Sequence, residues 1–326
     1  MFENIYIIEK LATIQHNELQ YKLERQHQIN NAGFYAGKTS TFNLFIKSGK
    51  NFLQSIEEKK MLSIIIIILI LLSLVFFAGK SHMYIIVERE RELLRSLSTD
   101  LSGRIYREDQ IEGLPVPVQR YFRNVLTDGQ PYISSVYLKH DGQFKTALDK
   151  EWINIEGEQH FTTDEPGFLW NGKTALFTVQ DMYIAGKGHI RVSLLNIIKV
   201  LDGKGPEYDQ GELLRWLGES VWFPTNLLPS SRLQWTAIDD NMAKLSFSYN
   251  DQILSYKVSF NGKGEIVQLE TSRYMSRENQ EIWIGRLSKY EEINGMKIPM
   301  EIEALWKLTD GEHSYARFNV NRIHHN

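Results

Sequence analysis

The chain of 326 residues has room for two domains, or for one large domain with appendages. Its 37 basic and 40 acidic residues are scattered and nearly balanced, so it lacks the basic patch that nucleic-acid binding requires. It contains no cysteine, which excludes disulfides, thiolate metal sites and a cysteine nucleophile. All seven tryptophans fall between Trp152 and Trp306, so we expect the large core beyond about Leu114.

Residues 1–60 precede the most apolar part of the chain. A polar helical stretch, NELQYKLERQHQINNAG, is followed by a segment rich in Gly, Ser, Thr and Lys. Neither part carries a motif with recognisable chemistry. We therefore predict a short N-terminal tail on the cytoplasmic side.

The segment MLSIIIIILILLSLVFFA, Met61–Ala78, carries no charged residue. Eighteen helical residues rise about 27 Å, close to the hydrocarbon thickness of a bilayer. A buried helix of a soluble core and a cleaved signal peptide are the alternatives, but the segment starts too far into the chain for the second. We predict a single transmembrane helix at 61–79. The pair Lys59–Lys60 outweighs Lys80, which favours an inside N-terminus and a large domain outside the cytoplasm.

The region after this segment reads as helical. YIIVERERELLRSLS alternates charge signs at helical spacing, which predicts a solvated stalk or linker helix within 80–113. Two prolines then precede VQRYFRNVL, and prolines are tolerated in the first turn of a helix. One face of this second predicted helix is apolar: Val118, Tyr121, Phe122 and Val125.

Beyond Gly129 the apolar period changes from 3.6 to 2, as it does within 243–249, 254–260, 302–308 and 316–320. Alternation of this kind is typical of antiparallel sheets with one packed face. Five pairs favour hairpin turns: Asp141-Gly142, Asn171-Gly172, Asn261-Gly262, Asn294-Gly295 and Asp310-Gly311. We predict a mainly β domain with helices (α+β) over 114–326, a strongly curved antiparallel meander, or half-barrel, packed on a mid-domain helix.

That mid-domain helix is predicted at 207–222, within GPEYDQGELLRWLGESVWFP. Leucines, Trp216 and a valine cover one arc, while Glu212, Arg215 and Glu219 lie together on the other, where Arg215 can reach both acids. One interpretation is a solvated charged face. The other is that the apolar arc plugs the curved sheet while the charges line its mouth, with Arg215 as a donor for a ligand's carboxylate, phosphate or amide.

Several blocks resemble a bacterial domain family of unknown function whose members are often membrane-anchored: LPVPVQRYFRNVL, GFLWNGKT, GPEYDQGELLRWLGESVWFPTNLL and IPMEIEALWKLTDGEHSYARF. The likeness covers most of 114–326 and implies no activity. The order of helix, strands, helix and strands is more loosely similar to the lipoprotein-carrier superfamily of the LolA and LolB type. That resemblance implies a curved antiparallel sheet around helices, with an apolar cavity for acyl chains.

Other constellations are weaker. Nucleophile-elbow, zinc-protease, phosphate-loop and dinucleotide motifs are missing, and the spacing of His140, His160, His189 and His313 matches no metal-ligand rule, so we expect neither cofactor nor metal. The acid pairs Asp164-Glu165 and Asp239-Asp240 read as turn residues. Arg273 and Arg317 are expected at the solvent, with a cavity-rim role as the alternative.

The tryptophans permit two interpretations, a large core or an aromatic-walled pocket. Our first hypothesis is a membrane-anchored domain that binds a lipid-like ligand, with these candidate binding residues: Glu212, Arg215, Glu219, Trp216, Trp222, Trp170 and Trp306. The second is an assembly module with a solid core, which docks a membrane protein partner through the exposed charged stripe. The third is an enzyme that uses Glu219 or Glu212 as a base and Arg215 to hold an anion.

Overall fold

The computed structural model describes the backbone of residues 41–326 and the side chains from Lys59 onward. The chain divides into two compact units, one within Tyr6–Tyr84 and the other comprising Ile85–Asn326. The polar helix expected at 17–33 lies outside the described residues.

Helix α2, Thr41–Ser96, contains the predicted membrane segment. Its portion from Lys59 is long and apolar enough to cross a membrane, with a mean hydropathy of 3.2 in an 18-residue window. The sequence predicted a membrane helix and a separate stalk helix, whereas the structure has one continuous helix that ends at Ser96. Only the short helix η1, Glu108–Ile111, follows within the rest of the predicted stalk.

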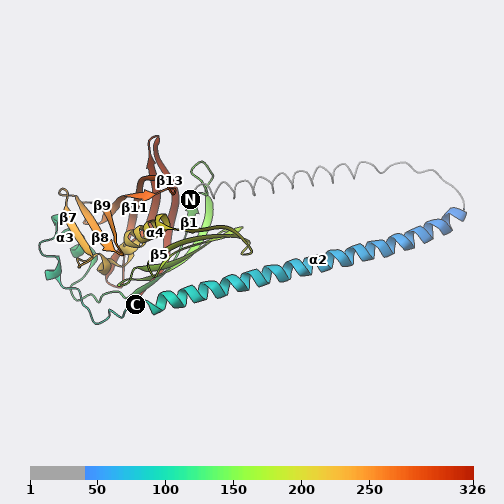
Figure 1. Ribbon diagram of the computed structural model, residues 1–326, viewed down its shortest axis with the longest axis horizontal. Helices are drawn as coiled ribbons and strands as arrows, with labels where there is room; N and C mark the ends of the chain where they lie inside the picture. The colour runs from blue at the N-terminus through green and yellow to red at the C-terminus, as the bar shows by residue number, and fades with distance from the viewer. Residues whose placement is uncertain (1–40) are drawn as a thin grey trace. The chain divides into compact units, whose positions relative to one another are not determined.

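Within the described residues, one antiparallel sheet of thirteen strands forms the second unit (Figure 1). The strands are β1 Ser135–Phe144, β2 Ile153–Thr162, β3 Gly167–Lys173, β4 Phe177–Ile184, β5 Lys187–Leu194, β6 Ile198–Lys204, β7 Leu233–Ala237, β8 Met242–Tyr249, β9 Gln252–Phe260, β10 Ile266–Tyr274, β11 Gln280–Ile293, β12 Met296–Leu308 and β13 Gly311–His325. Two meanders, β1 to β6 and β7 to β13, join where β1 pairs with β13. The predicted curved α+β meander is confirmed.

The mid-domain helix α4, Pro206–Glu219, leaves one edge strand, β6, and returns through two 3-10 helices to the other edge strand, β7. The 3-10 helices are η2, Ser220–Trp222, and η3, Pro224–Leu227. Figure 1 shows α4 enclosed by strands of both meanders. The crossover therefore lies on the inner face of the curved sheet and is covered by both halves.

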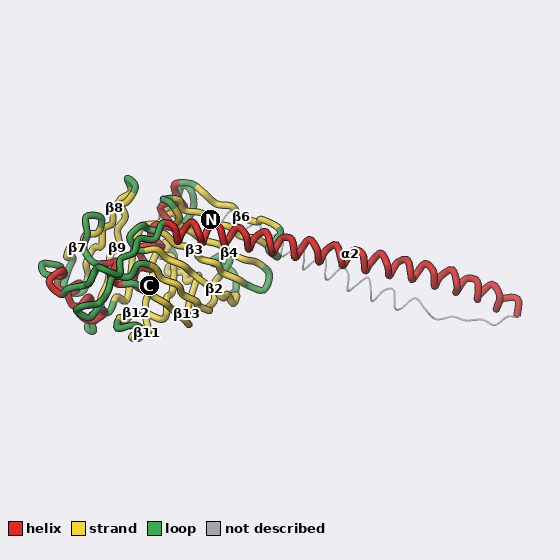
Figure 2. Tube along the Cα trace, turned by 90° about the horizontal axis from the view of Figure 1, so that it is seen from below, coloured by secondary structure: helices red, strands yellow, loops and turns green. Residues whose placement is uncertain are grey.

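Alternation along the strands separates the inner face from the outer one. In β2, Ile155, Gln159 and Phe161 are buried toward α4, while Glu156 is exposed on the other side. The last turns of α2 cover part of the outer face, where Leu94 packs with a cluster of apolar side chains from β3 and β4 (Figure 2). The curved sheet thus has helices on both faces.

Helix α3, Val116–Val125, forms where the sequence predicted it. Pro115 is its N-cap residue, and the apolar face is buried as expected. Tyr121 packs its ring 5.9 Å from that of Phe260, and Phe122 lies 6.5 Å from Trp235. These contacts hold α3 on the inner face of β7 to β9.

Three of the five predicted hairpin turns are confirmed: Asn261-Gly262, Asn294-Gly295 and Asp310-Gly311 connect consecutive strands from β9 to β13. The other two are wrong, because Asp141-Gly142 lies inside β1 and Asn171-Gly172 inside β3. A side chain at Gly142 would collide with the backbone of Arg317 and Phe318 on β13. Glycine serves close packing at these positions instead of a turn.

Candidate functional site

Local sequence explains why α4 begins at Pro206. Gly205 precedes it with a φ of 136°, a conformation that favours glycine, and proline suits the first turn of a helix. Asp209 then holds the helix on β5, because its carboxylate accepts hydrogen bonds from the Gly188 backbone N–H at 2.8 Å and from Lys187 Nζ at 3.0 Å. Gly188 is required here, since a side chain would collide with the backbone of Tyr208.

The predicted charged arc of α4 is buried instead of solvated. Glu212 is 1% exposed and Glu219 is 7% exposed. The reason is the crossover position of α4, which places strands of the sheet against both arcs of the helix. The interpretation of this arc as a solvated face is therefore wrong, and so is a partner-docking stripe made of these residues.

Arg215 is the centre of the buried charges. Its Nε donates to Glu219 Oε1 at 2.9 Å, and its Nη1 donates to Asp181 Oδ2 on β4. The second oxygen of Glu219 accepts a hydrogen bond from Gln159 Nε2 at 2.7 Å. The guanidinium carbon also lies 4.8 Å from the centre of the Trp170 ring. Helix α4, β2 and β4 thus meet at a single guanidinium.

A second arginine approaches from the other meander. Arg273 on β10 lies with its Nη2 3.5 Å from Glu212 Oε1 and is only 7% exposed. The expected solvent exposure of Arg273 is wrong, while Arg317 is exposed as expected, with 56% of its side chain accessible. We call the set the buried charge cluster: Asp181, Glu212, Arg215, Glu219 and Arg273.

Burial decides the protonation of this cluster. It raises the pKa of Glu212 to about 8, with a further contribution from the Asp181 carboxylate and opposition from both arginines. Burial disfavours the charged form of Arg215, but the surrounding carboxylates more than offset this and raise the pKa of the guanidinium. Burial also raises the pKa of Asp181 and the pKa of Glu219, and in both cases the Arg215 guanidinium opposes the rise by favouring the carboxylate.

Three polar atoms near α4 have no hydrogen-bond partner among the described residues. They are Asp181 Oδ1, Glu212 Oε2 and the Tyr183 hydroxyl, each of them buried. A buried polar atom without a partner costs about 1–3 kcal/mol. An ionised carboxylate oxygen only accepts hydrogen bonds, so Asp181 presents an acceptor to any group that reaches it.

The predicted aromatic site residues are distributed over the inner face. Trp170 lies under Arg215 and donates its indole N–H to His140 Nε2 at 2.7 Å. Trp216 and Trp222 donate to the backbone carbonyls of Thr162 and Pro299, at 2.8 and 2.9 Å, and are fully buried. These two fit the core interpretation.

Trp306 reaches the second arginine indirectly. Its ring stacks on Tyr315, whose hydroxyl accepts the indole N–H of Trp283 at 2.9 Å. Trp283 in turn lies below the Arg273 guanidinium, 5.8 Å from its carbon to the ring centre. Of the predicted tryptophans, the structure therefore brings Trp170 to the buried charge cluster directly.

Asp181 and Gln159 were missed by the sequence reading. The signal for Asp181 is its place in FTVQDMYI, where it occupies the same alternating row as Phe177, Val179 and Tyr183. An acid in an apolar row of a strand predicts either a break in the sheet or a buried partner. Gln159 occupies such a row in β2.

The histidines and the paired acids hold structural positions. Within residues 59–326, no group of three or more His, Asp or Glu side chains is arranged to hold a metal ion. His189 contacts Asp202 on the neighbouring strand, and His313 contacts Asp310 at 2.7 Å. Asp164-Glu165 and Asp239-Asp240 lie in turns, as predicted.

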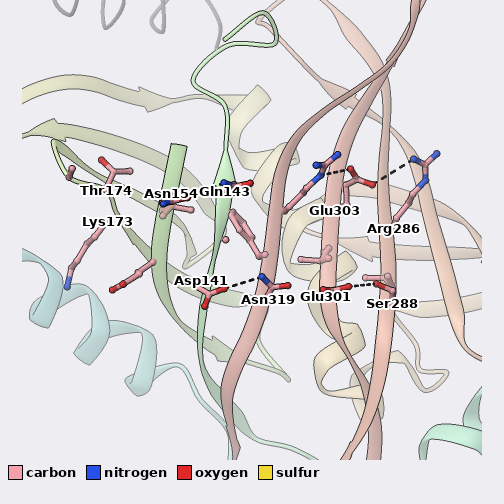
Figure 3. Close-up of a pocket in the computed structure, with 18 of the residues that line it drawn as sticks. Asp141, Gln143, Asn154, Lys173, Thr174, Arg286, Ser288, Glu301, Glu303 and Asn319 are labelled. Atoms are coloured by element: carbon pink, nitrogen blue, oxygen red, sulfur yellow. Dashed lines mark hydrogen bonds and ion pairs between the residues drawn. The ribbon is translucent and has the colours of Figure 1, made fainter. Parts of the chain in front are cut away.

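A second concave region lies on the outer face of β1, β2 and β11 to β13 (Figure 3). This depression has a volume of about 1190 Å³ and is lined by both polar and apolar side chains. Most of its charges are paired across strands, as in Arg317 Nε to Glu303 Oε1 at 2.9 Å and Arg286 Nη2 to Glu312 Oε2 at 2.6 Å. Exposed pairs of this kind contribute little to stability or to specific binding, so the depression ranks below the buried charge cluster.

Fold and site together define a class: an antiparallel half-barrel wrapped around a charged crossover helix. The chain belongs to the DUF6544 family, a family of unknown function, whose model matches residues 104–318. The expected membership of a domain family of unknown function is confirmed. A search of curated proteins finds no match to the chain.

Solved structures with some similarity include a LolA superfamily protein from Nitrosomonas europaea, 11% identical, covering 64% of this chain and 90% of that chain, with a TM-score of 0.35. Another is a DUF1329 family protein from Desulfovibrio piger, 10% identical, covering 67% of this chain and 89% of that chain, with a TM-score of 0.30. At these scores the likenesses assign neither a ligand nor an activity.

Proposed function

We propose that the chain is a single-pass membrane protein whose large domain, outside the cytoplasm, binds an amphiphilic, lipid-like ligand on the inner face of its sheet. The buried charge cluster carries this proposal. Removing charges from water costs several kcal/mol each, and well-packed apolar residues in their place are often neutral or stabilising. Five charged side chains around one helix are therefore not explained by folding stability, and strongly perturbed carboxyls are typical of functional sites.

The ligand's polar group is expected both to donate and to accept hydrogen bonds. Two of the three guanidinium nitrogens of Arg215, Nε and Nη1, already donate to Glu219 and Asp181. The oxygens without a partner are Asp181 Oδ1, which an O–H or N–H group can reach as a donor, and Glu212 Oε2, which can carry the O–H of a protonated carboxyl. A hydroxyl or an amide therefore fits the two positions, and the amide is among the groups expected from the sequence.

The apolar part of the ligand would lie along the inner-face side chains of β4 to β6. In these strands Ile190, Val192 and Leu201 lie in the same inward rows as Asp181. Each of the three is less than 10% exposed. Asp181 and Arg215 each keep 13% of their side-chain surface accessible, more than Glu212 at 2%, which makes them the first contacts for an entering head group.

Native mass spectrometry of residues 85–326 tests the proposal, because this unit includes the end of α2 that packs on the sheet. The wild-type domain, purified without added lipid, should carry a bound amphiphile. Asp181→Asn and Glu212→Gln keep the shape of the site and should reduce that bound fraction. Glu303→Gln on the outer face is the matched control and should retain it. A ligand-free wild-type mass would contradict the proposal.

The raised pKa of Glu212 favours acid–base catalysis as a second candidate function, because a carboxyl that titrates near neutral pH can both give and take a proton. A substrate would need α4 to move, since Glu212 is 1% exposed. If a reaction is found, Glu212→Gln should abolish turnover while the melting temperature stays at or above the wild-type value. If Glu212→Gln loses ligand binding but the wild-type protein turns over no substrate, this candidate function is contradicted.

A further inference from the structure

Two neighbouring loops at one end of the sheet expose large apolar side chains. Leu176 lies between β3 and β4, Leu195 and Ile197 lie between β5 and β6, and Ile198 is the first residue of β6, with exposures of 41–54%. The loops are joined, because the Leu195 backbone N–H donates to the Leu176 carbonyl at 2.9 Å. We call these four residues the rim patch. Isolated exposed apolar residues need no explanation, but a contiguous set indicates an interaction surface.

Backbone strain accompanies this exposure. Leu195 adopts a φ of 52° and Asn196 a φ of 60°, a left-handed conformation that glycine or asparagine adopts at lower cost than leucine. The loop therefore retains leucine at a position where a small polar residue would relieve strain and improve solubility. Folding alone gives no reason for leucine there.

Lysines border the rim patch. The sequence has no acidic residue from Lys173 to Gln180 or from Arg191 to Leu201, and Lys173 and Lys199 flank the two loops, with Lys199 Nζ paired to Asp202 Oδ2 at 2.7 Å. Apolar side chains bordered by lysines are the composition of segments that lie in the interface of a bilayer with anionic lipids.

The contacts of the last turns of α2 show in which direction this helix runs along β4. Leu94 packs with Met182 and Ile184 near the end of β4. One turn earlier in α2, Glu90 pairs with Arg191 at 2.6 Å, and Arg191 donates to Gln180 at 3.0 Å. Moving back along α2 therefore means moving back along β4, toward Phe177 and the rim patch.

The distances permit contact with a bilayer. From Gln180 to Leu176 the strand extends about 13 Å, at about 3.3 Å per residue. The unit begins at Ile85, seven positions after Ala78, where the apolar segment ends, so the chain between them spans at most about 25 Å. Within this unit, the part of α2 that begins at Ile85 therefore lies toward the end of β4 that is next to the rim patch.

We propose that the rim patch inserts into the surface of the same bilayer that holds the apolar segment, so that the domain is held against the membrane at two places. This inference rests on the membrane anchoring proposed above and is independent of the ligand. It gives the mouth of β4 to β6 direct access to lipid. The rim patch contacts the head-group and upper acyl region of the bilayer. If a protein partner covered the patch instead, the patch would stay exposed to water in vesicles that contain lipid alone.

Single cysteines provide the test, because the full chain contains none. The full-length protein carrying Leu176→Cys or Ile198→Cys is labelled with a polarity-sensitive fluorophore and reconstituted in vesicles of phosphatidylcholine and phosphatidylglycerol. A nitroxide-labelled lipid with its spin label near the head group is then added. In vesicles, both labels should emit at a shorter wavelength than the same labels on the isolated 85–326 domain in detergent-free buffer. The nitroxide lipid should quench both labels.

Ile253→Cys is the matched control. Ile253 is an isoleucine 81% exposed on β9. Its neighbouring turn residue Asn250 approaches Gly186, which lies at the end of β4 and β5 opposite the rim patch. Its label should remain unquenched, and near-ultraviolet circular dichroism verifies that each labelled protein is folded.

Vesicle flotation separates the outcomes. If the protein floats and positions 176 and 198 are quenched more strongly than position 253, the proposal is supported. If it floats and the three positions are quenched equally, the rim patch does not contact lipid and this inference is wrong. If the protein does not float, the membrane anchoring itself is wrong, and the rim-patch proposal is wrong with it.

Discussion

Replacement of Arg215 by methionine tests whether the buried charge cluster depends on its central cation. Methionine keeps a long unbranched side chain over the rings of Phe168 and Trp170, which lie 5.1 and 4.8 Å from the guanidinium carbon. It removes the partner of Asp181 and Glu219, whose carboxylates remain inside the sheet. The perturbation therefore isolates charge from packing.

The expected loss is large. Removing one partner of a buried ion pair costs about 3–5 kcal/mol, because a buried charge is left uncompensated. A domain of this size shifts its melting temperature by about 2–4 °C per kcal/mol, so Arg215→Met should lower Tm by about 6–20 °C. Protonation of Asp181 or Glu219 would relieve part of the loss, so the difference from wild type should shrink at acidic pH.

Differential scanning fluorimetry of residues 85–326 measures this shift. The control is Arg317→Met, because Arg317 also pairs with a glutamate and also lies over a tryptophan, 4.6 Å from the Trp152 ring, but is exposed. An exposed pair contributes about 0–1 kcal/mol, so the control should melt within a few degrees of wild type. Equal shifts for the two variants, or no recovery when Asp181→Asn and Glu219→Gln are added to Arg215→Met, would refute the reasoning.

Three further predictions concern pH and packing. The pKa of Glu212 is raised by burial from 4.5 to about 8, so the folded state holds a proton that the unfolded state releases, and stability should fall as pH rises from about 4.5 to 8. Glu212→Gln should reduce this loss in thermal melts at a series of pH values. His140 acts in the opposite sense, because burial lowers its pKa from 6.5 to about 4. Stability should therefore fall as pH drops from about 6.5 to 4, and this fall should remain in Glu212→Gln. Gly172→Ala would place a methyl group against the Trp170 ring and should cost about 1–3 kcal/mol by chemical denaturation. Gly262→Ala, with open space around it, should stay within about 0.5 kcal/mol, and equal effects would contradict the packing argument.

The fold class was predictable because alternation, turns and helix periodicity are local. Asn261-Gly262 and Asn294-Gly295 mark their hairpins from the sequence alone. The two wrong turn predictions, at Gly142 and Gly172, have one cause: glycine occurs in turns but also where another group approaches the backbone closely. Only the tertiary structure shows that Gly142 lies against β13 and Gly172 against the Trp170 ring. Local patterns do not contain that information.

The candidate site was predictable in part. Helical spacing correctly placed Glu212, Arg215 and Glu219 on one arc of α4. It did not indicate whether this arc meets water, because that depends on which strands enclose a crossover helix. Asp181 lies 34 residues before Arg215 and Arg273 lies 61 residues after Glu212 in the chain. Contacts over such separations follow from topology and are not encoded in any one segment.

The buried charge cluster draws on both halves of the sheet. Asp181 belongs to the first meander, Arg273 belongs to the second, and Arg215 and Glu212 belong to the crossover between them. Because buried ion pairs add little net stability but tolerate only a narrow geometry, we infer that the cluster fixes how the two meanders are set around α4. A head group that forms a hydrogen bond with Asp181 Oδ1 or Glu212 Oε2 would bond to this junction, so the occupancy of the inner face and the spacing of the meanders should change together. Hydrogen exchange of the β1–β13 ladder, slower with ligand than without it and unaffected by ligand in Asp181→Asn, would demonstrate that coupling.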